Sequence, residues 1–522
     1  MSHKISVLFT LLFGVFMLPP PAAARQSCES LAAMKIPHVT ITLATAIEPA
    51  PEYEAPNPKT PVWTADPIKV TVPFCRVTGY STPAKDSHIG FEIWLPRADH
   101  WNGKYMGIGT PGFVGFIAYR ALARNMQKGY ATASADNGHV DVDTPGEAPT
   151  AEWGGIPDKV IDWGHRSQHE TTVIAKRLVK AYYGTPAKYA YWNSCHEGGN
   201  QALTELQRYP QDFDGIVAGD PAYYITHLQS VTEFVTLTLV GDGPDSPTFF
   251  PTAKYPVLHR AVLDACDALD GVRDNIIDDP TRCQFDPGTI QCPSYRDDLS
   301  CLTPAQVAAV RKVYGGGKFA DGTEIYPGFE RGSELQWNFL GRGPGPFKAS
   351  TGFFAYMVYP NQNWDYHTFD LARDARNAEA RIGSMVDSNN PNLKPFRDHG
   401  GKVIMYAAWD ESGIPPRGLM NYYKSVVENM GGLEQTQKFA RLYMPAGMGM
   451  CPGFGDPDSF DTQKAIELWV EQGQAPDAIM SKHKVGNVVH RTRPVCAWPK
   501  VAIYKGNGDT SGAANYSCGT RE

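Results

Sequence analysis

Apolar residues recur in short runs along this chain, and their spacing predicts strands and helices. Three β-rich runs separated by Pro and Gly turns are typical of antiparallel strands at a sheet edge; they span residues 68–75, 89–95 and 104–109. Further along, strand patterns at 130–135 and 189–195 alternate with helical patterns at 166–183 and after Gly199. Such alternation favours a mainly parallel sheet whose strands are buried on both faces. The chain is therefore predicted to be an α/β protein.

The alternation stops between about residues 224 and 394, where Pro, Gly, aromatic residues and two clustered cysteine pairs replace it. A long segment without a pattern is unusual inside a compact domain unless it forms a unit of its own. We predict an inserted lid at residues 224–394 that covers the turn following residue 195, and we place substrate specificity in it. Its aromatic residues include Phe353, Phe354, Tyr356 and Tyr359. A buried strand pattern returns at 402–406, so the core comprises residues 25–223 and 395–522.

One strand-turn-helix stretch is tighter than the others and has His196 at its apex. A turn of this kind, the nucleophile elbow, needs small residues two before and two after the apex, and it pushes the apex side chain out above the sheet. Ser194 and Gly198 meet that requirement. The geometry is that of a serine hydrolase, but the apex carries no hydroxyl.

The sequence around this turn resembles the tannase and feruloyl esterase family, whose members carry Gly-Cys-Ser-x-Gly-Gly at this point. The resemblance rests on SCHEGGNQ at 194–201, QRYP at 207–210 and FDGIVAG at 213–219, and it runs from about Cys28 to Cys518. It implies an α/β-hydrolase core with a mainly parallel sheet and a large inserted lid domain, rich in disulfides. In this family the apex serine is the nucleophile, and a histidine and an acid complete the triad.

All three triad positions differ in this chain. His196 stands in place of the serine, Met450 stands where the catalytic histidine precedes Cys451, and Glu411 takes the place of the acid in the segment that begins at Trp409. A carboxylate at Glu411 can still orient a partner. With the nucleophile and its base both absent, the acyl-enzyme mechanism of the family is not expected.

The region expected to bind the substrate's carbonyl oxygen is altered as well. A Gly-x-Gly-Gly loop that lines the oxyanion hole in the family reads Gly109-Thr110-Pro111-Gly112 here, and Pro111 has no N–H to donate. We assign Gly109, Thr110, Glu197 and Met450 to this region.

Two functions from different classes fit these replacements. In the first, which we favour, His196 and Glu411 carry out acid/base chemistry on a small aromatic or phenolic molecule: proton abstraction, elimination, isomerisation or water-activated hydrolysis. Histidine suits this role because its ordinary pKa of about 6.5 allows proton transfer near neutral pH. In the second, the chain is an inactive esterase homologue that binds an aromatic ligand. A contact between His196 and Glu411 would favour the first.

Composition narrows the choice of partners and compartment. The chain of 522 residues has a formal net charge of −7 and no long basic run, which argues against nucleic acid and anionic membrane surfaces as partners. Lys4, an apolar run at 5–18 and Ala22-Ala23-Ala24 form a secretory signal peptide at residues 1–24. We expect a secreted or periplasmic mature chain without a membrane span.

Ten cysteines in a secreted chain suggest five disulfides, although the sequence alone leaves the pairing open. Their spacing matches no zinc-site template. The resemblance implies five pairs: Cys28 with Cys75, Cys195 with Cys451, Cys266 with Cys283, Cys292 with Cys301, and Cys496 with Cys518.

An acidic loop in the predicted lid is a candidate metal site. Its carboxylates at Asp267, Asp270 and Asp274 surround Gly271 and offer the hard oxygen ligands that Ca²⁺ prefers. Taken alone, the loop reads as an acidic surface turn. The resemblance implies one structural Ca²⁺, with these three side chains and the carbonyls of Val272 and Ile276 as ligands. No organic cofactor is expected.

Overall fold

The computed structural model describes residues 25–53, 68–140, 150–293, 296–341, 343, 345–453, 455–457 and 459–521. The predicted signal peptide, residues 1–24, lies outside the described residues.

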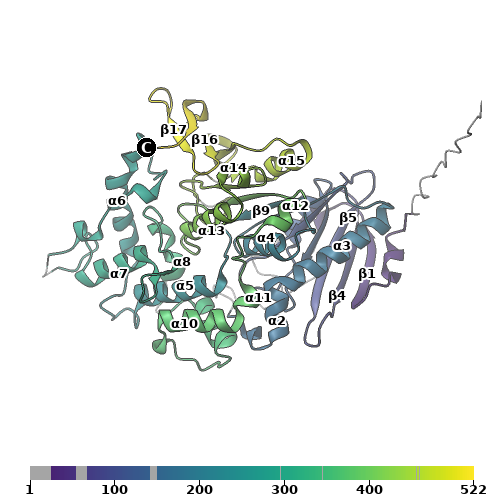
Figure 1. Ribbon diagram of the computed structural model, residues 1–522, viewed down its shortest axis with the longest axis horizontal. Helices are drawn as coiled ribbons and strands as arrows, with labels where there is room; N and C mark the ends of the chain where they lie inside the picture. The colour runs from purple at the N-terminus through teal and green to yellow at the C-terminus, as the bar shows by residue number, and fades with distance from the viewer. Residues whose placement is uncertain are drawn as a thin grey trace, which may run out of the picture.

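A nine-stranded sheet forms the centre of the protein (Figure 1). In spatial order its strands are β1 (Val39–Ile47), β4 (Phe74–Ser81), β5 (Ile89–Pro96), β7 (Ala131–Ala135), β6 (Lys104–Ile108), β8 (Tyr189–Cys195), β9 (Gly215–Gly219), β12 (Lys402–Tyr406) and β13 (Ala440–Tyr443). The pairs from β1 to β7 are antiparallel, and every pair from β7 to β13 is parallel. The prediction of a mainly parallel α/β sheet is confirmed.

Two of the early strands differ from the prediction. The run at 104–109 was expected at an antiparallel edge, but β6 lies between β7 and β8 and is parallel to both. Its residues are buried from Tyr105 to Ile108, which is typical of a central parallel strand and not of an edge. The run at 68–75 divides at Pro73, which cannot donate to a sheet. Before it, β3 (Ile68–Val70) pairs with β2 (Ala50–Tyr53) in a separate sheet.

Alternate residues of the parallel strands pack on opposite faces of the sheet. Tyr191, Val217 and Ile404 face one apolar cluster, together with α1 (Tyr119–Met126) and α15 (Thr462–Gln472). Trp192, Ile216 and Val403 face the other, together with α3 (Ser167–Tyr183) and α4 (Glu197–Arg208). Burial of one such apolar side chain contributes about 1.5–3 kcal/mol. The short helix α2 (Pro157–Ile161) leads into α3.

The segment between β9 and β12, which the sequence left without a pattern, is mainly helical (Figure 1, teal and green). Its helices are α5 (Ile225–Val240), α6 (Tyr255–Cys266), α7 (Pro304–Gly315), α8 (Asn338–Gly341), α9 (Lys348–Gly352), α10 (Leu371–Ala378), α11 (Ser384–Val386) and α12 (Lys394–Asp398). A hairpin of β10 (Gly317–Lys318) and β11 (Glu324–Tyr326) joins them. Thr303 and Gln306 form a capping box at the start of α7, a local signal that the sequence carried.

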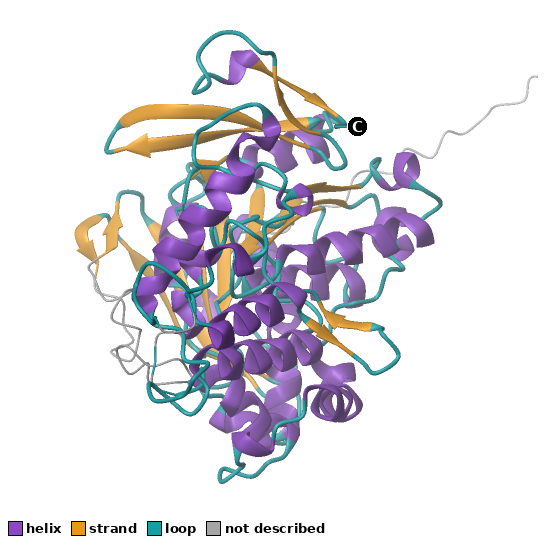
Figure 2. Ribbon diagram, turned by 90° about the vertical axis from the view of Figure 1, so that its left-hand side faces the viewer, coloured by secondary structure: helices purple, strands orange, loops and turns teal. Residues whose placement is uncertain are grey.

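The C-terminal part adds small sheets beside the core, seen at the top of Figure 2. After α13 (Pro416–Asn429) and α14 (Leu433–Thr436), strands β14 (Ser459–Phe460), β15 (Ala478–Val485) and β16 (Val488–Cys496) form a three-stranded sheet. Strands β17 (Val501–Tyr504) and β18 (Tyr516–Gly519) form a hairpin. Neither of these small sheets was predicted from the sequence.

Five disulfides join distant parts of the chain, and they are the pairs that the resemblance implies: Cys28–Cys75, Cys195–Cys451, Cys266–Cys283, Cys292–Cys301 and Cys496–Cys518. Among the described residues, no helix has the length and apolar character needed to cross a membrane.

Candidate active site at the elbow

The turn between β8 and α4 has the backbone geometry of a nucleophile elbow. His196 has φ 63° and ψ −122°, a conformation that side-chain-bearing residues rarely adopt. A Cβ on Gly198 would lie 2.0 Å from Ser194 Oγ, and one on Gly109 would lie 2.8 Å from Gly198 Cα. The structure therefore explains the small residues that the sequence places around the apex.

Backbone hydrogen bonds hold the apex in this conformation. The N–H of His196 donates to the carbonyl of Gly219 at 2.9 Å. The carbonyl of His196 accepts the N–H groups of Gly199, Asn200 and Ala222 at 3.0 to 3.2 Å. The apex is thus fixed both to its own helix and to the end of β9.

The imidazole of His196 is half-buried and makes no side-chain hydrogen bond to the part of the chain that the structure describes. Its Nδ1 is shielded from solvent and has no partner. Burial lowers the pKa of His196 to about 4, because the charged imidazolium loses its hydration. The ring is therefore neutral at neutral pH and can accept a proton.

Glu411 lies in the loop after β12, with its carboxylate turned toward its own backbone. Glu411 Oε1 accepts the N–H groups of Gly413 at 2.5 Å and Ile414 at 3.1 Å, while Oε2 is buried without a partner. Neither a hydrogen bond nor an ion pair joins Glu411 to His196, both of which lie in the described part of the chain. The contact that would have oriented His196 is absent. The Glu411 carboxylate is hydrogen bonded to the N–H groups of its own loop instead.

A second buried acid, Asp220, lies next to Glu411 and was not identified from the sequence. It follows β9 directly, and its Oδ1 accepts the N–H of Ala408 at 2.6 Å. Burial raises the pKa of Asp220 well above its usual range, and the charge of Glu411 raises it further. Burial also raises the pKa of Glu411 to about 7. Carboxyl ends of adjacent parallel strands meet at one edge of a sheet, which is the signal that could have identified Asp220.

This pair of acids makes stability depend on pH. Glu411 keeps its proton in the folded state up to about pH 7 but loses it near pH 4.5 when unfolded, so stability falls as pH rises between these values. Glu411→Gln preserves the oxygen that accepts both amides and removes the charge. We expect the variant to be more stable than the parent at pH 8 by up to about 3 kcal/mol, with little gain at pH 4.

Thermal melts from pH 4 to pH 8 test this expectation. Glu434→Gln is the matched control, because Glu434 lies on the surface. Parallel pH curves for Glu411→Gln and the parent protein would contradict a raised pKa at Glu411.

In the region that the resemblance assigns to the oxyanion hole, the N–H of Thr110 is engaged and the N–H of Glu197 is free. The N–H of Thr110 donates to Gln201 Oε1 at 3.2 Å, and Asn137 Nδ2 donates to Thr110 Oγ1 at 2.6 Å. At the start of α4, the N–H of Glu197 has no acceptor among the described residues. The Glu197 side chain is buried and accepts from Asn200 Nδ2 at 2.9 Å. The free polar group of Glu197 at the elbow is therefore its N–H, since its carboxylate is engaged with Asn200.

The disulfide Cys195–Cys451 brings Met450 to the elbow. Its S–S distance is 2.02 Å, and the carbonyl oxygen of Met450 lies 3.4 Å from Cys195 Sγ. The side chain of Asp220 lies close to both sulfurs. Because the two sulfurs are bonded to each other, this group is not a metal centre.

Three of the four aromatic residues named in the predicted lid have structural roles. Phe353 and Phe354 are fully buried in the main apolar cluster, and Tyr359 donates its hydroxyl to Asp374. Their spacing reflects core packing. The predicted lid segment contacts α4 through Ser388, whose hydroxyl donates to Asn200 Oδ1 one turn after the elbow.

The five predicted calcium ligands lie in the short helix and loop that directly follow α6: Asp267, Asp270, Val272, Asp274 and Ile276. Asp270 Oδ1 accepts the N–H of Val272 at 2.9 Å. Burial raises the pKa of Asp270 to about 6, and the neighbouring charges of Asp278 and Asp274 add to this. Asp274 is also paired with Arg493 at 2.6 Å. A bound divalent cation would reduce the electrostatic repulsion between these neighbouring carboxylates.

The donor set fits Ca²⁺ in type, since it consists of carboxylate and carbonyl oxygens. The three loop carboxylates do not gather within 4.8 Å of one another in the described chain. Oxygens on opposite sides of a calcium ion bound at 2.3–2.6 Å lie up to about 5 Å apart, so this spacing does not exclude the ion.

Known proteins resemble this chain over nearly its whole length. The family described as tannase and feruloyl esterase matches residues 75–519. An uncharacterized esterase of Xanthomonas campestris pv. campestris is 34% identical over 99% of this chain and 95% of its own length. A probable feruloyl esterase B-1 of Aspergillus fumigatus is 33% identical over 88% of this chain and 89% of its own.

Solved structures show the same fold. Feruloyl esterase B from Aspergillus oryzae superposes with a TM-score of 0.85 at 29% identity, covering 94% of this chain and 99% of that one. Tannin acyl hydrolase from Aspergillus niger superposes with a TM-score of 0.76 at 20% identity, covering 96% and 94%.

Proposed function

Because this chain belongs to the tannase and feruloyl esterase family, we propose that it hydrolyses small phenolic esters, with a water molecule as nucleophile and His196 as the base. The proposal is supported by one observation above all. The apex of a preserved elbow presents a neutral imidazole beside the unpaired N–H of Glu197. The names of the relatives point to phenolic esters as the substrate class.

In the proposed reaction the N–H of Glu197 binds the ester carbonyl oxygen and stabilises the negative charge that develops there. His196 accepts a proton from a water molecule as that water adds to the carbonyl carbon. The bond between the acyl carbon and the leaving oxygen then breaks, and the proton passes from the imidazolium to that oxygen. The products are the free acid and the alcohol or phenol, with His196 neutral again.

A second function, binding of an aromatic ligand without turnover, is favoured by two observations. The first is that no hydrogen bond or ion pair joins His196 to Glu411, both of which the structure describes. The second is that Gln201 Oε1 occupies the N–H of Thr110, which leaves the oxyanion region with the single amide of Glu197. Loss of one such donor costs about 10² to 10³ in rate. Both functions involve ligand binding, so only an assay of hydrolysis distinguishes them.

The direct test is hydrolysis of a panel of methyl and phenyl esters of hydroxycinnamic and hydroxybenzoic acids by the purified mature chain. We expect release of the acid above the rate in buffer, measured by chromatography. Heat-denatured protein is the control. Binding of these esters without any release of acid would replace hydrolysis with the binding function.

The disulfides and the predicted signal peptide support an assignment of the compartment. Five disulfides form and persist in oxidising compartments. We propose that the mature chain is secreted or periplasmic.

We also propose that the acidic loop binds one structural Ca²⁺ through the side chains of Asp267, Asp270 and Asp274 and the carbonyls of Val272 and Ile276. The ion would neutralise the carboxylates and tie the end of α6 to the following loop. We expect about one Ca²⁺ per chain and a lower Tm after chelation, since a ligand present at 100 times its Kd stabilises by about 2.7 kcal/mol.

Asp270→Ala is expected to lose the ion and to melt at the chelated temperature with or without added calcium. Asp264→Ala removes the same charge at an exposed position of α6 and serves as control. Metal analysis by mass spectrometry together with thermal melts measures both effects. An Asp270→Ala variant that retains one equivalent of calcium would contradict the assignment.

A further inference from the structure

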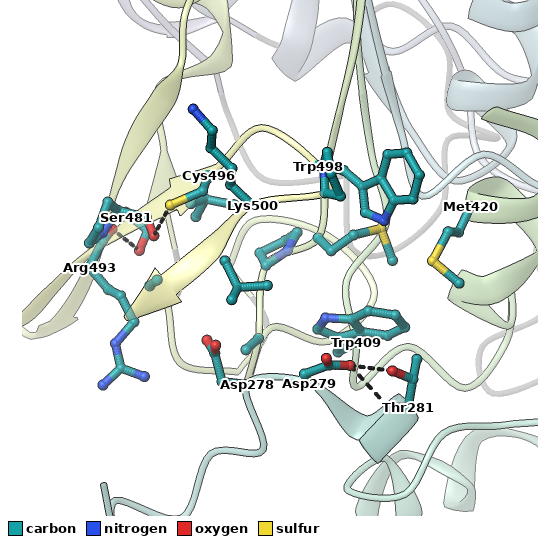
Figure 3. A pocket seen from close by; sticks show the side chains of 18 of the residues that line it. Asp278, Asp279, Thr281, Trp409, Met420, Ser481, Arg493, Cys496, Trp498 and Lys500 are labelled. Atoms are coloured by element: carbon teal, nitrogen blue, oxygen red, sulfur yellow. Dashed lines mark hydrogen bonds between the residues drawn. The ribbon is translucent and has the colours of Figure 1, made fainter. Parts of the chain in front are cut away.

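A cavity of about 320 Å³ lies away from the elbow, at the junction of the core and the C-terminal sheets (Figure 3). Its walls come from the loop after β12, from α13, from the loop after β13 and from the strands β15 to β17. His196, Glu411 and Met450 are not among its lining residues. It is therefore a separate cavity, at the lower end of the size range of small-molecule sites.

Two tryptophans present their indoles to this cavity, and Figure 3 shows them on facing sides of it. Trp409 is only 5% exposed, yet its indole N–H has no acceptor in the described part of the chain. A buried indole usually finds a hydrogen-bond partner. The indole nitrogen of Trp409 is not shielded from solvent, so it is open to the cavity.

The second tryptophan, Trp498, is fixed by contacts with Tyr423 and Leu442. Its ring packs edge-on against Tyr423 with centroids 5.9 Å apart, and its backbone N–H donates to the carbonyl of Leu442 at 2.8 Å. Its indole N–H also has no acceptor among the described residues. The two rigid aromatic surfaces, with Met420 beside them in Figure 3, suit a flat apolar ligand that also carries hydrogen-bond acceptors.

Two lysines and one aspartate around the cavity carry charges that no ion pair among the described residues balances. Lys424 and Lys500 are exposed at its rim, and neither side chain has a hydrogen bond or ion pair within the described residues. Of the two acids that line the cavity, Asp278 is paired with a cation and Asp279 has hydrogen bonds only, so the two lysines outnumber the one unpaired acid. Asp278 pairs with Arg521 at 2.8 Å, and Asp279 accepts the N–H of Thr281 at 3.2 Å. The lysines thus favour an anion.

We propose that this cavity binds a small aromatic carboxylate, with its ring between Trp409 and Trp498 and its carboxylate at Lys424 and Lys500. The ring buries apolar surface against the indoles, and the ammonium groups pair with the acid. Trp409 lies two residues before Glu411 in the same loop, so the bound ligand also contacts the segment that carries the acid of the elbow site. Binding does not depend on the reaction at His196.

Calorimetry and tryptophan fluorescence on the full mature chain test this proposal with 4-hydroxycinnamate as the probe. We expect saturable binding that quenches tryptophan emission. The neutral 4-hydroxycinnamyl alcohol should bind about tenfold more weakly, because two ion pairs are lost.

Two variants assign the binding to this cavity. Trp498→Leu and the double variant Lys424→Ala/Lys500→Ala should each weaken binding about tenfold, whereas Lys482→Ala, which removes an exposed lysine elsewhere on β15, should leave the affinity unchanged. Thermal melts confirm that each variant is folded. No binding up to about 10 mM, equal affinity for the alcohol, or binding unaffected by both cavity variants would each overturn the proposal.

Discussion

His196→Ala is expected to lower kcat/KM for phenolic esters by about 10² to 10⁴, the usual contribution of one general acid/base group. The imidazole stands at the elbow apex and is unprotonated at neutral pH, because burial lowers its pKa to about 4, so it can accept a proton from water. Removing it leaves the N–H of Glu197 and the substrate-binding surface intact. The loss should therefore appear mainly in kcat and leave KM little changed.

Two controls separate chemistry from structure. Met450→Leu conserves volume at the position where the family has its catalytic histidine, and we expect it to retain activity. Added imidazole should partly restore hydrolysis to His196→Ala by entering the space of the missing ring. Activity in His196→Ala equal to that of the parent would remove His196 from the reaction.

Removal of the disulfide Cys195–Cys451 is expected to cost about 5.5 kcal/mol in the chain-entropy model, since it closes a loop of 256 residues. Cys292–Cys301 closes a loop of only 9 residues, and its loss should cost about 2.5 kcal/mol in the same model. Double alanine variants of each pair thus form a matched set with identical chemistry. Guanidinium denaturation measures both.

Loss of Cys195–Cys451 is expected to affect activity as well as stability. The disulfide holds the loop of Met450 against the end of β8, next to the apex. We expect the double variant to lose activity even where it remains folded. Equal destabilisation by the two pairs would contradict the view that loop length dominates.

The sequence predicted the core well because its signals are local. Alternating strands and helices, and small residues at Ser194 and Gly198, follow from the backbone geometry of a parallel sheet and an elbow. The antiparallel assignment of 104–109 was wrong because strand direction depends on pairing with distant segments. Only the neighbours β7 and β8 make β6 a central parallel strand.

The site was harder to predict, since it depends on where side chains turn. The resemblance to the family indicated the position of Glu411. Its hydrogen bonds from the N–H groups of Gly413 and Ile414 depend on the conformation of the loop, which the sequence does not show. Asp220 was missed because an acid after a strand has no distinctive local pattern. The cavity at Trp409 and Trp498 joins residues far apart in the chain, and no sequence spacing indicates it.

The pH dependence of kcat/KM tests the role of His196 most directly. A base must be deprotonated to act, so the rate should rise through the pKa of His196 near pH 4 and be level above about pH 5. The same limb should disappear in His196→Ala, whose residual rate is limited by water alone. A rate that rises near pH 6.5 in the parent protein, or a limb near pH 4 that persists in His196→Ala, would contradict the account.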